Sequence, residues 1–156
     1  MRLYFKQRMF SWFDSYDIYD EAGSPIYSVR GTPSWGHRLR IYDCSGREVG
    51  CVEEKILTFL PRFEFIAGDT TIGTLSKEFT FLHPRFHLDY RDWRIEGNWI
   101  GWDYEIQDEH GNQVAQITKE PWNLTDTYWI DTPHASDALL ALMVTLAIDA
   151  EKCSGS

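Results

Sequence analysis

A short pattern of apolar and polar positions recurs along the chain. An isoleucine is followed by Asp, Gly and two further apolar residues at fixed intervals, in residues 18–29, 41–52 and 106–117. A less regular copy starts at Phe65. Apolar residues alternate before each Asp, which predicts a strand, and the Gly supplies the positive φ of a short turn. The pattern therefore predicts a series of β-hairpins, with structural glycines at Gly23, Gly46 and Gly111.

The same spacing predicts strands along the rest of the chain. The outgoing strands are marked by six apolar residues: Ile18, Ile41, Phe65, Leu88, Ile106 and Ile130. Return strands are expected at about 25–31, 48–55, 70–77, 93–97 and 113–119, and one further strand precedes them near 2–7. Twelve short strands with regular turns and no helix between them are typical of an antiparallel sandwich or barrel.

Residues 136–152 are predicted to form a helix that is apolar on every face. Only Thr145 and Asp149 are polar between Ala138 and Ala150. Such a helix either spans a membrane or lies in a protein core, and this run is shorter than the about 20 apolar residues of a span. A twelve-stranded barrel is wide enough to hold it. We therefore expect a mainly β protein, a closed twelve-stranded antiparallel β-barrel around one central hydrophobic C-terminal α-helix.

The predicted barrel occupies residues 1–153 as a single domain, which suits a chain of 156 residues. Residues 154–156 are expected to be a disordered tail. The hairpin turns should lie at one end of the barrel, the hairpin end, which collects acidic residues. The helix should start there after Pro133, so that Asp149 emerges at the other end and pairs with Lys55, Lys77 or Lys119.

The connections between hairpins define that other end, the connection end. Each connection carries an aromatic residue: Trp12, Trp35, Phe59, Phe81, Trp99 and Trp122. Two connections are near copies of one another, residues 55–63 and 77–86, and both contain Lys, Phe, Pro and Arg. The candidate ligand-binding residues are the basic side chains of this end: Lys55, Arg62, Lys77, Arg85 and Lys119.

Composition and charge narrow the possible functions. The formal net charge of −9 argues against nucleic acid as a partner. The odd number of three cysteines and the absence of a signal-peptide pattern favour a cytoplasmic protein, peripheral to a membrane at most. No transmembrane segment is expected, and we expect a monomer.

The sequence contains no residue pattern that is typical of an enzyme. The five histidines are dispersed, no nucleophile or phosphate-binding motif occurs, and Glu53 and Glu54 should point to opposite faces of one strand. We expect neither a metal site nor a cofactor, and no catalytic residues.

The chain resembles the LURP-one-related family over essentially its whole length. The resemblance is carried by the opening residues 6–11, the Asp20-Glu21-x-Gly23 turn, the returns after Gly46 and Gly111, residues 125–128, and the Leu/Ala-rich helix that closes on Ile148-Asp149. This family is similar to the C-terminal domain of tubby proteins and to phospholipid scramblases. The resemblance implies a twelve-stranded barrel around a central helix.

Two functional hypotheses stay open at this point. In the first, the protein is a non-enzymatic module whose basic and aromatic connection end recognises phospholipid or phosphoinositide headgroups, with anionic lipid or a protein as partner. In the second, it is a structural or protein–protein interaction domain with no small ligand. The aromatic residues would then plug the barrel end, and the basic residues would pair with nearby acids.

Overall fold

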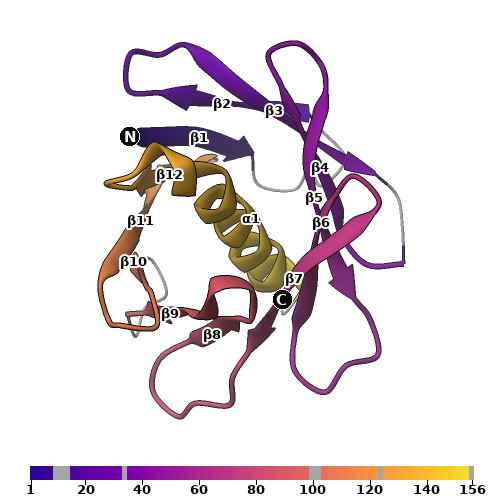
Figure 1. Ribbon diagram of the computed structural model, residues 1–156, viewed down its shortest axis with the longest axis vertical. Coiled ribbons are helices and arrows are strands. Elements are labelled where there is room, and N and C mark those ends of the chain that lie inside the picture. The colour runs from indigo at the N-terminus through magenta and orange to yellow at the C-terminus, as the bar shows by residue number, and fades with distance from the viewer. Residues whose placement is uncertain (9–14, 33–34, 99–102, 123–124, 155–156) are drawn as a thin grey trace.

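Twelve antiparallel strands close into a barrel around a single long helix in the computed structural model (Figure 1). The structure describes residues 1–8, 15–32, 35–98, 103–122 and 125–154. The strands are β1 (Arg2–Arg8), β2 (Ser15–Asp20), β3 (Pro25–Thr32), β4 (Arg38–Asp43), β5 (Glu48–Lys55), β6 (Arg62–Ala67), β7 (Thr70–Lys77), β8 (Arg85–Leu88), β9 (Trp93–Gly97), β10 (Asp103–Gln107), β11 (Gln113–Trp122) and β12 (Thr125–Asp131). The predicted fold class is confirmed.

Every strand pairs with its neighbours in sequence, and β12 pairs with β1 to close the barrel. This last pairing runs from Arg2 opposite Asp131 to Arg8 opposite Thr125. Because the barrel is closed, each strand is hydrogen-bonded to a neighbour on both sides. The barrel therefore has no strand edge for a second chain to extend.

The repeated hairpins form as the spacing predicts. Gly23, Gly46 and Gly111 have φ values of 82°, 80° and 79°, which a residue without Cβ adopts at no steric cost. The preceding Asp closes each turn. Oδ1 of Asp20 accepts hydrogen bonds from the backbone N–H of Ala22 at 2.9 Å and of Ser24 at 2.8 Å. The same carboxylate arrangement recurs at the other two turns, and the strand register shifts beside all three. Each shift marks a β-bulge or a similar irregularity in the hairpin.

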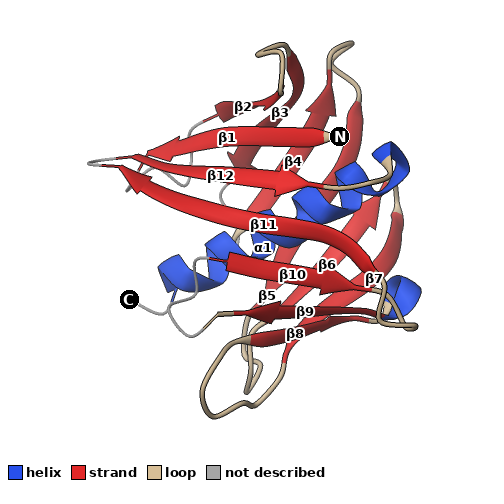
Figure 2. Cartoon of the chain, turned by 90° about the vertical axis from the view of Figure 1, so that its left-hand side faces the viewer, coloured by secondary structure: helices blue, strands red, loops and turns tan. Residues whose placement is uncertain are grey.

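The helix α1 (Ala138–Ser154) fills the barrel interior (Figure 2). It starts two residues later than expected because residues 135–137 form a separate 3-10 turn, η2 (Ala135–Asp137). Its end at Ser154 extends beyond the predicted 152 and includes the first residue of the expected tail. Thr145, fully buried, donates its hydroxyl to the carbonyl of Ala141 at 2.8 Å, which satisfies a polar group inside the core.

The helix runs from the hairpin end to the connection end, as predicted. A second 3-10 turn, η1 (Tyr90–Asp92), joins β8 to β9 at the hairpin end, and its Arg91 pairs with Asp137 at 2.8 Å. Near the other end of the helix, Glu151 pairs with Lys77 at the end of β7 at 2.5 Å. No helix in the described part of the chain is long and apolar enough to cross a membrane.

Candidate binding site at the connection end of the barrel

Two neighbouring connections expose large apolar side chains. They are the β5–β6 loop (residues 56–61) and the β7–β8 loop (residues 78–84), which project from the same side of the barrel (Figure 1). The exposed fractions are 99% for Leu57, 96% for Phe59, 84% for Phe79, 95% for Phe81 and 71% for Leu82. We call these five residues the apolar tips.

Backbone hydrogen bonds hold both loops outside the wall. The N–H of Lys77 donates to the carbonyl of Pro61 at 2.9 Å, and the N–H of Glu78 donates to the carbonyl of Arg85 at 2.8 Å. Leu57 has a φ of 62°, a left-handed conformation that costs a leucine about 1–2 kcal/mol. A strained backbone that turns an apolar side chain wholly into solvent is typical of a functional loop.

Three aromatic residues of the connection end that the structure describes do not plug the barrel as one hypothesis expected. Phe59 and Phe81 point into solvent, and Trp35 in the β3–β4 connection is 88% exposed. Trp12, Trp99 and the side chain of Trp122 lie outside the described residues.

The five candidate basic residues divide between two faces of the wall. Phe63 and Leu75 are fully buried on the inner face, so their neighbours Arg62 and Ser76 face outward. Lys55 lies opposite Arg62 in the register and shares its outer face, and Arg85, before the buried Phe86, does so too.

Lys77 and Lys119 instead face the barrel mouth, which is the opening of the barrel at the connection end, where α1 ends. The ammonium of Lys77 lies 5.9 Å from the ring centroid of buried Phe86, and that of Lys119 lies 5.7 Å from the ring centroid of buried Tyr128. The five candidates therefore do not converge on one ligand.

Four of these five basic side chains are paired with carboxylates. Lys55 lies 3.1 Å from Glu64 and 3.4 Å from Glu53. Arg85 lies 3.1 Å from Glu96, and Lys119 lies 2.9 Å from Asp126. Lys77 is held by Glu151. Among the described residues, no carboxylate lies within ion-pair distance of Arg62.

The prediction that Asp149 pairs with Lys55, Lys77 or Lys119 is wrong, because the structure places Asp149 against Tyr128. Asp149 is 5% exposed, and its Oδ1 accepts a hydrogen bond from the Tyr128 hydroxyl at 2.5 Å. Lys55, Lys77 and Lys119 form their ion pairs with the other acids named above. The acid of the helix that holds one of these lysines is Glu151, two residues later.

Burial and neighbouring charges shift the pKa values of groups in the barrel mouth. Desolvation, with the nearby charge of Lys119, lowers the pKa of Lys152 to about 8. Its ammonium lies 5.1 Å from the ring centroid of Tyr104. Burial, with the charge of Glu151, raises the pKa of Tyr104, and burial beside Asp149 raises the pKa of Tyr16. The polar groups of the mouth are thus packed around the helix end.

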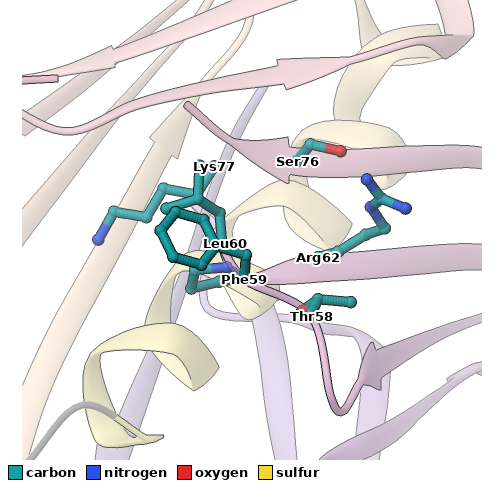
Figure 3. A pocket seen from close by; sticks show the side chains of 7 residues that line it. Thr58, Phe59, Leu60, Arg62, Ser76 and Lys77 are labelled. Carbon is teal, nitrogen blue, oxygen red and sulfur yellow. The ribbon is translucent and has the colours of Figure 1, made fainter. Parts of the chain in front are cut away.

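A shallow pocket of about 370 Å³ lies at the base of the β5–β6 loop (Figure 3). It is lined by Thr58, Phe59, Leu60, Pro61, Arg62, Ser76 and Lys77. Arg62 and Ser76 are direct cross-strand partners. In Figure 3 the guanidinium and the hydroxyl point to the same side, whereas the Lys77 ammonium points away from them. Arg62 is therefore the cation of this pocket that is open to a ligand.

Sequence reasoning missed Leu57, Phe79 and Leu82 as site residues. Each lies in one of the two near-copy connections, within two positions of a phenylalanine that the sequence did single out. The duplicated apolar run between two basic residues was the signal that pointed to them.

Comparison with known proteins shows relatives along nearly the whole chain. A family model described as LURP-one-related matches residues 1–149. The Bacillus subtilis (strain 168) protein described as uncharacterized protein YxjI is 30% identical over 151 residues, which are 96% of this chain and 92% of that protein. The X-ray structure of a protein from Arabidopsis thaliana aligns with a TM-score of 0.62 and 17% identity, covering 95% of this chain and 90% of that one. This last likeness shows a shared fold.

Proposed function

The chain belongs to the LURP-one-related family, and we propose that it is a non-enzymatic module that attaches to a phospholipid surface through its β5–β6 and β7–β8 loops. The observation that carries this proposal is the exposure of the apolar tips, which are 71–99% accessible. Single exposed apolar residues are ordinary, but five large ones on two adjacent loops are typical of an interaction surface.

The energy available from the apolar tips is sufficient for reversible attachment. Fully burying a Leu or Phe side chain contributes about 1.5–3 kcal/mol. Even partial insertion of several of them matches the marginal affinity of a single lipid anchor. Because the tips lie at one end of a rigid barrel, they can enter one surface together.

The residues at the base of the loops suit a lipid interface. The run from Lys55 to Arg62 contains no acidic residue, and Lys77 and Arg85 flank the second loop. The long stems of these side chains cover apolar surface at the base of the loops, and Arg62 is the one of them without a carboxylate partner among the described residues.

A non-enzymatic role is supported by the barrel interior. The helix occupies it, and side chains of α1 such as Leu142 and Val144 are fully buried against the wall. Catalysis needs a concave site with convergent polar groups. The pocket beside Arg62 is shallow and has one open cation.

Vesicle flotation tests the proposal. Wild-type protein is expected to float with vesicles of phosphatidylcholine or of phosphatidylcholine mixed with phosphatidylserine. The double variant Phe59→Ser/Phe81→Ser should lose at least about tenfold in affinity, because each change removes a side chain that would enter the lipid. Tyr90→Ser is the matched control, since it removes a 39% exposed aromatic ring from the hairpin end.

Two outcomes would overturn the proposal. One is a wild-type protein that floats with neither kind of vesicle. The other is a Phe59→Ser/Phe81→Ser variant that floats as well as the wild type. If a soluble protein partner is captured instead, and the same two substitutions abolish its binding, the module is a protein–protein interaction domain.

A further inference from the structure

We propose that the apolar tips select an electrically neutral phospholipid surface, with Arg62 as the single contact to a headgroup phosphate. The inference rests on the attachment proposed above and names the lipid class that it uses. Zwitterionic headgroups carry one phosphate each and no net charge, and phosphatidylcholine is the probe.

On the outer wall beside the loops, the charge of Lys55 is already balanced by carboxylates of the protein. Glu53 lies 3.0 Å from Arg38 and 3.4 Å from Lys55, and Lys55 also lies 3.1 Å from Glu64. The side chain of Glu53 is 20% exposed and that of Glu64 is 30% exposed. A phosphate approaching Lys55 would also approach these two carboxylates, so this lysine offers no net attraction.

Arg85 is balanced in the same way, between Glu96 at 3.1 Å and Glu78 at 3.9 Å. Lys77 and Lys119 face the barrel mouth and are engaged by Glu151 and Asp126. Their side chains are only 28% and 16% exposed. A multivalent anionic headgroup therefore finds no cluster of open cations among the described basic residues beside these two loops.

Arg62 differs from the other four basic residues. It is exposed, it has no carboxylate within ion-pair distance among the described residues, and it lines the pocket with Phe59 and Ser76. A guanidinium matches a phosphate through two parallel hydrogen bonds, and the Ser76 hydroxyl opposite it adds a third donor. Phe59 belongs to both the pocket and the apolar tips. One lipid can therefore place its phosphate at Arg62 while its chains lie against Phe59.

Long-range electrostatics favour the same lipid class. Each Lys or Arg close to an anionic membrane contributes about 1 kcal/mol, and of the five basic candidates only Arg62 lacks a carboxylate partner among the described residues. The protein as a whole carries a net charge of −9, so an anionic surface repels it within a Debye length. A neutral surface imposes no such repulsion on the apolar tips.

Cosedimentation with three kinds of vesicle tests the inference. They are phosphatidylcholine alone, phosphatidylcholine with phosphatidylserine, and phosphatidylcholine with a phosphatidylinositol bisphosphate, each at low and at high salt. We expect phosphatidylcholine alone to bind at least as well as either anionic mixture, with an affinity that salt changes less than about twofold. Arg62→Gln should weaken binding to phosphatidylcholine roughly threefold to tenfold. Arg47→Gln should not change it, because Arg47 is an 80% exposed arginine at the hairpin end.

The possible failures are distinguishable from one another. Binding only to the anionic vesicles, lost at high salt, overturns this inference and leaves the attachment itself standing. No binding to any vesicle overturns both. Equal binding by Arg62→Gln and wild type overturns the role of Arg62. Calorimetry with inorganic phosphate tests whether the ligand is a soluble phosphate and not a lipid headgroup. Saturable phosphate binding at Arg62 without vesicle binding would assign the pocket to free phosphate and overturn the inference.

Discussion

The Tyr128 hydroxyl donates a hydrogen bond to Oδ1 of Asp149 at 2.5 Å, and this bond joins β12 to α1 inside the barrel. Both side chains are buried, with exposures of 1% and 5%. A residue two positions further along an α-helix lies about 200° around the helix axis. Glu151 therefore faces the opposite wall, where β7 presents Lys77. The two acids attach the end of the helix to both sides of the barrel.

Removing the Tyr128 hydroxyl is expected to destabilise the fold. Tyr128→Phe keeps the ring stacked on Phe5 at 5.1 Å but takes one donor from a buried carboxylate, which costs about 1–3 kcal/mol. Urea unfolding measures the loss. In combination with Asp149→Asn the two costs should not add, because both changes act on one bond. A Tyr128→Phe variant as stable as the control Tyr90→Phe would contradict the prediction.

The stability contribution of Lys152 should depend on pH. The pKa of this residue is about 8 in the folded protein, below its ordinary value of 10.5. Between these values the unfolded chain binds a proton that the folded chain has lost, so wild-type stability rises with pH in this window. Below about pH 8 both states are charged, and the penalty of burying the charge is present in full.

Replacing Lys152 by Met removes this titration. The variant should gain free energy of unfolding over the wild type at neutral pH, and the gain should shrink as the pH rises from about 8 towards 10.5. Denaturant unfolding at a series of pH values measures it. An identical gain at both ends of the window would show that Lys152 does not titrate as described.

Leu57→Asn should move stability and lipid affinity in opposite directions. Leu57 has a φ of 62° and is 99% exposed, so the change removes backbone strain without removing any packing. Asn tolerates this conformation better. We expect the free energy of unfolding to stay equal or to rise by up to about 1 kcal/mol, while affinity for vesicles falls.

Leu57→Ala separates the two effects. Alanine keeps the strained φ but loses the apolar surface, so affinity should fall with stability unchanged. Full vesicle affinity in both variants would remove Leu57 from the apolar tips.

Gly97→Ala is expected to destabilise the barrel through a steric clash. A Cβ at this position would lie 2.6 Å from Cε1 of Tyr104 and 2.7 Å from Cγ of Pro84. Tyr104 is 2% exposed and cannot move aside easily, so the cost should be about 1–3 kcal/mol. Thermal unfolding measures it. Adding Tyr104→Leu should recover part of the loss, and no recovery would place the clash elsewhere.

The sequence predicted the wall of the barrel well because its signals are local. Alternation of apolar residues marks a strand, and Gly23 or Gly46 marks a turn without reference to the rest of the chain. The start of the helix was harder to place. Asp137 is held by Arg91 from a distant turn, and residues 135–137 form η2 instead of the first helical turn. A contact between residues 46 positions apart leaves no local pattern.

The candidate site was predicted less completely for a similar reason. The position of an apolar residue in the sequence does not reveal whether it lies in the wall or beyond the end of a strand. Phe63 is fully buried and Phe59 is 96% exposed because β6 begins at Arg62. The partner of each basic residue likewise depends on strand register and on helix rotation. The sequence therefore located the basic connection end, but not which cation stays unpaired.

The pairing of β1 with β12 sets the order of events in folding. The backbone hydrogen bonds that seal the barrel join residues as far apart as Met1 and Thr132, 131 positions along the chain. Such long-range closure is slow because loop entropy is lost before the contacts form. The helix that supplies the core follows β12 after the short turn η2. During synthesis on the ribosome, the inner faces of the first eleven strands therefore stay without their core until β12 and α1 have emerged, so this barrel is expected to depend on chaperones until then.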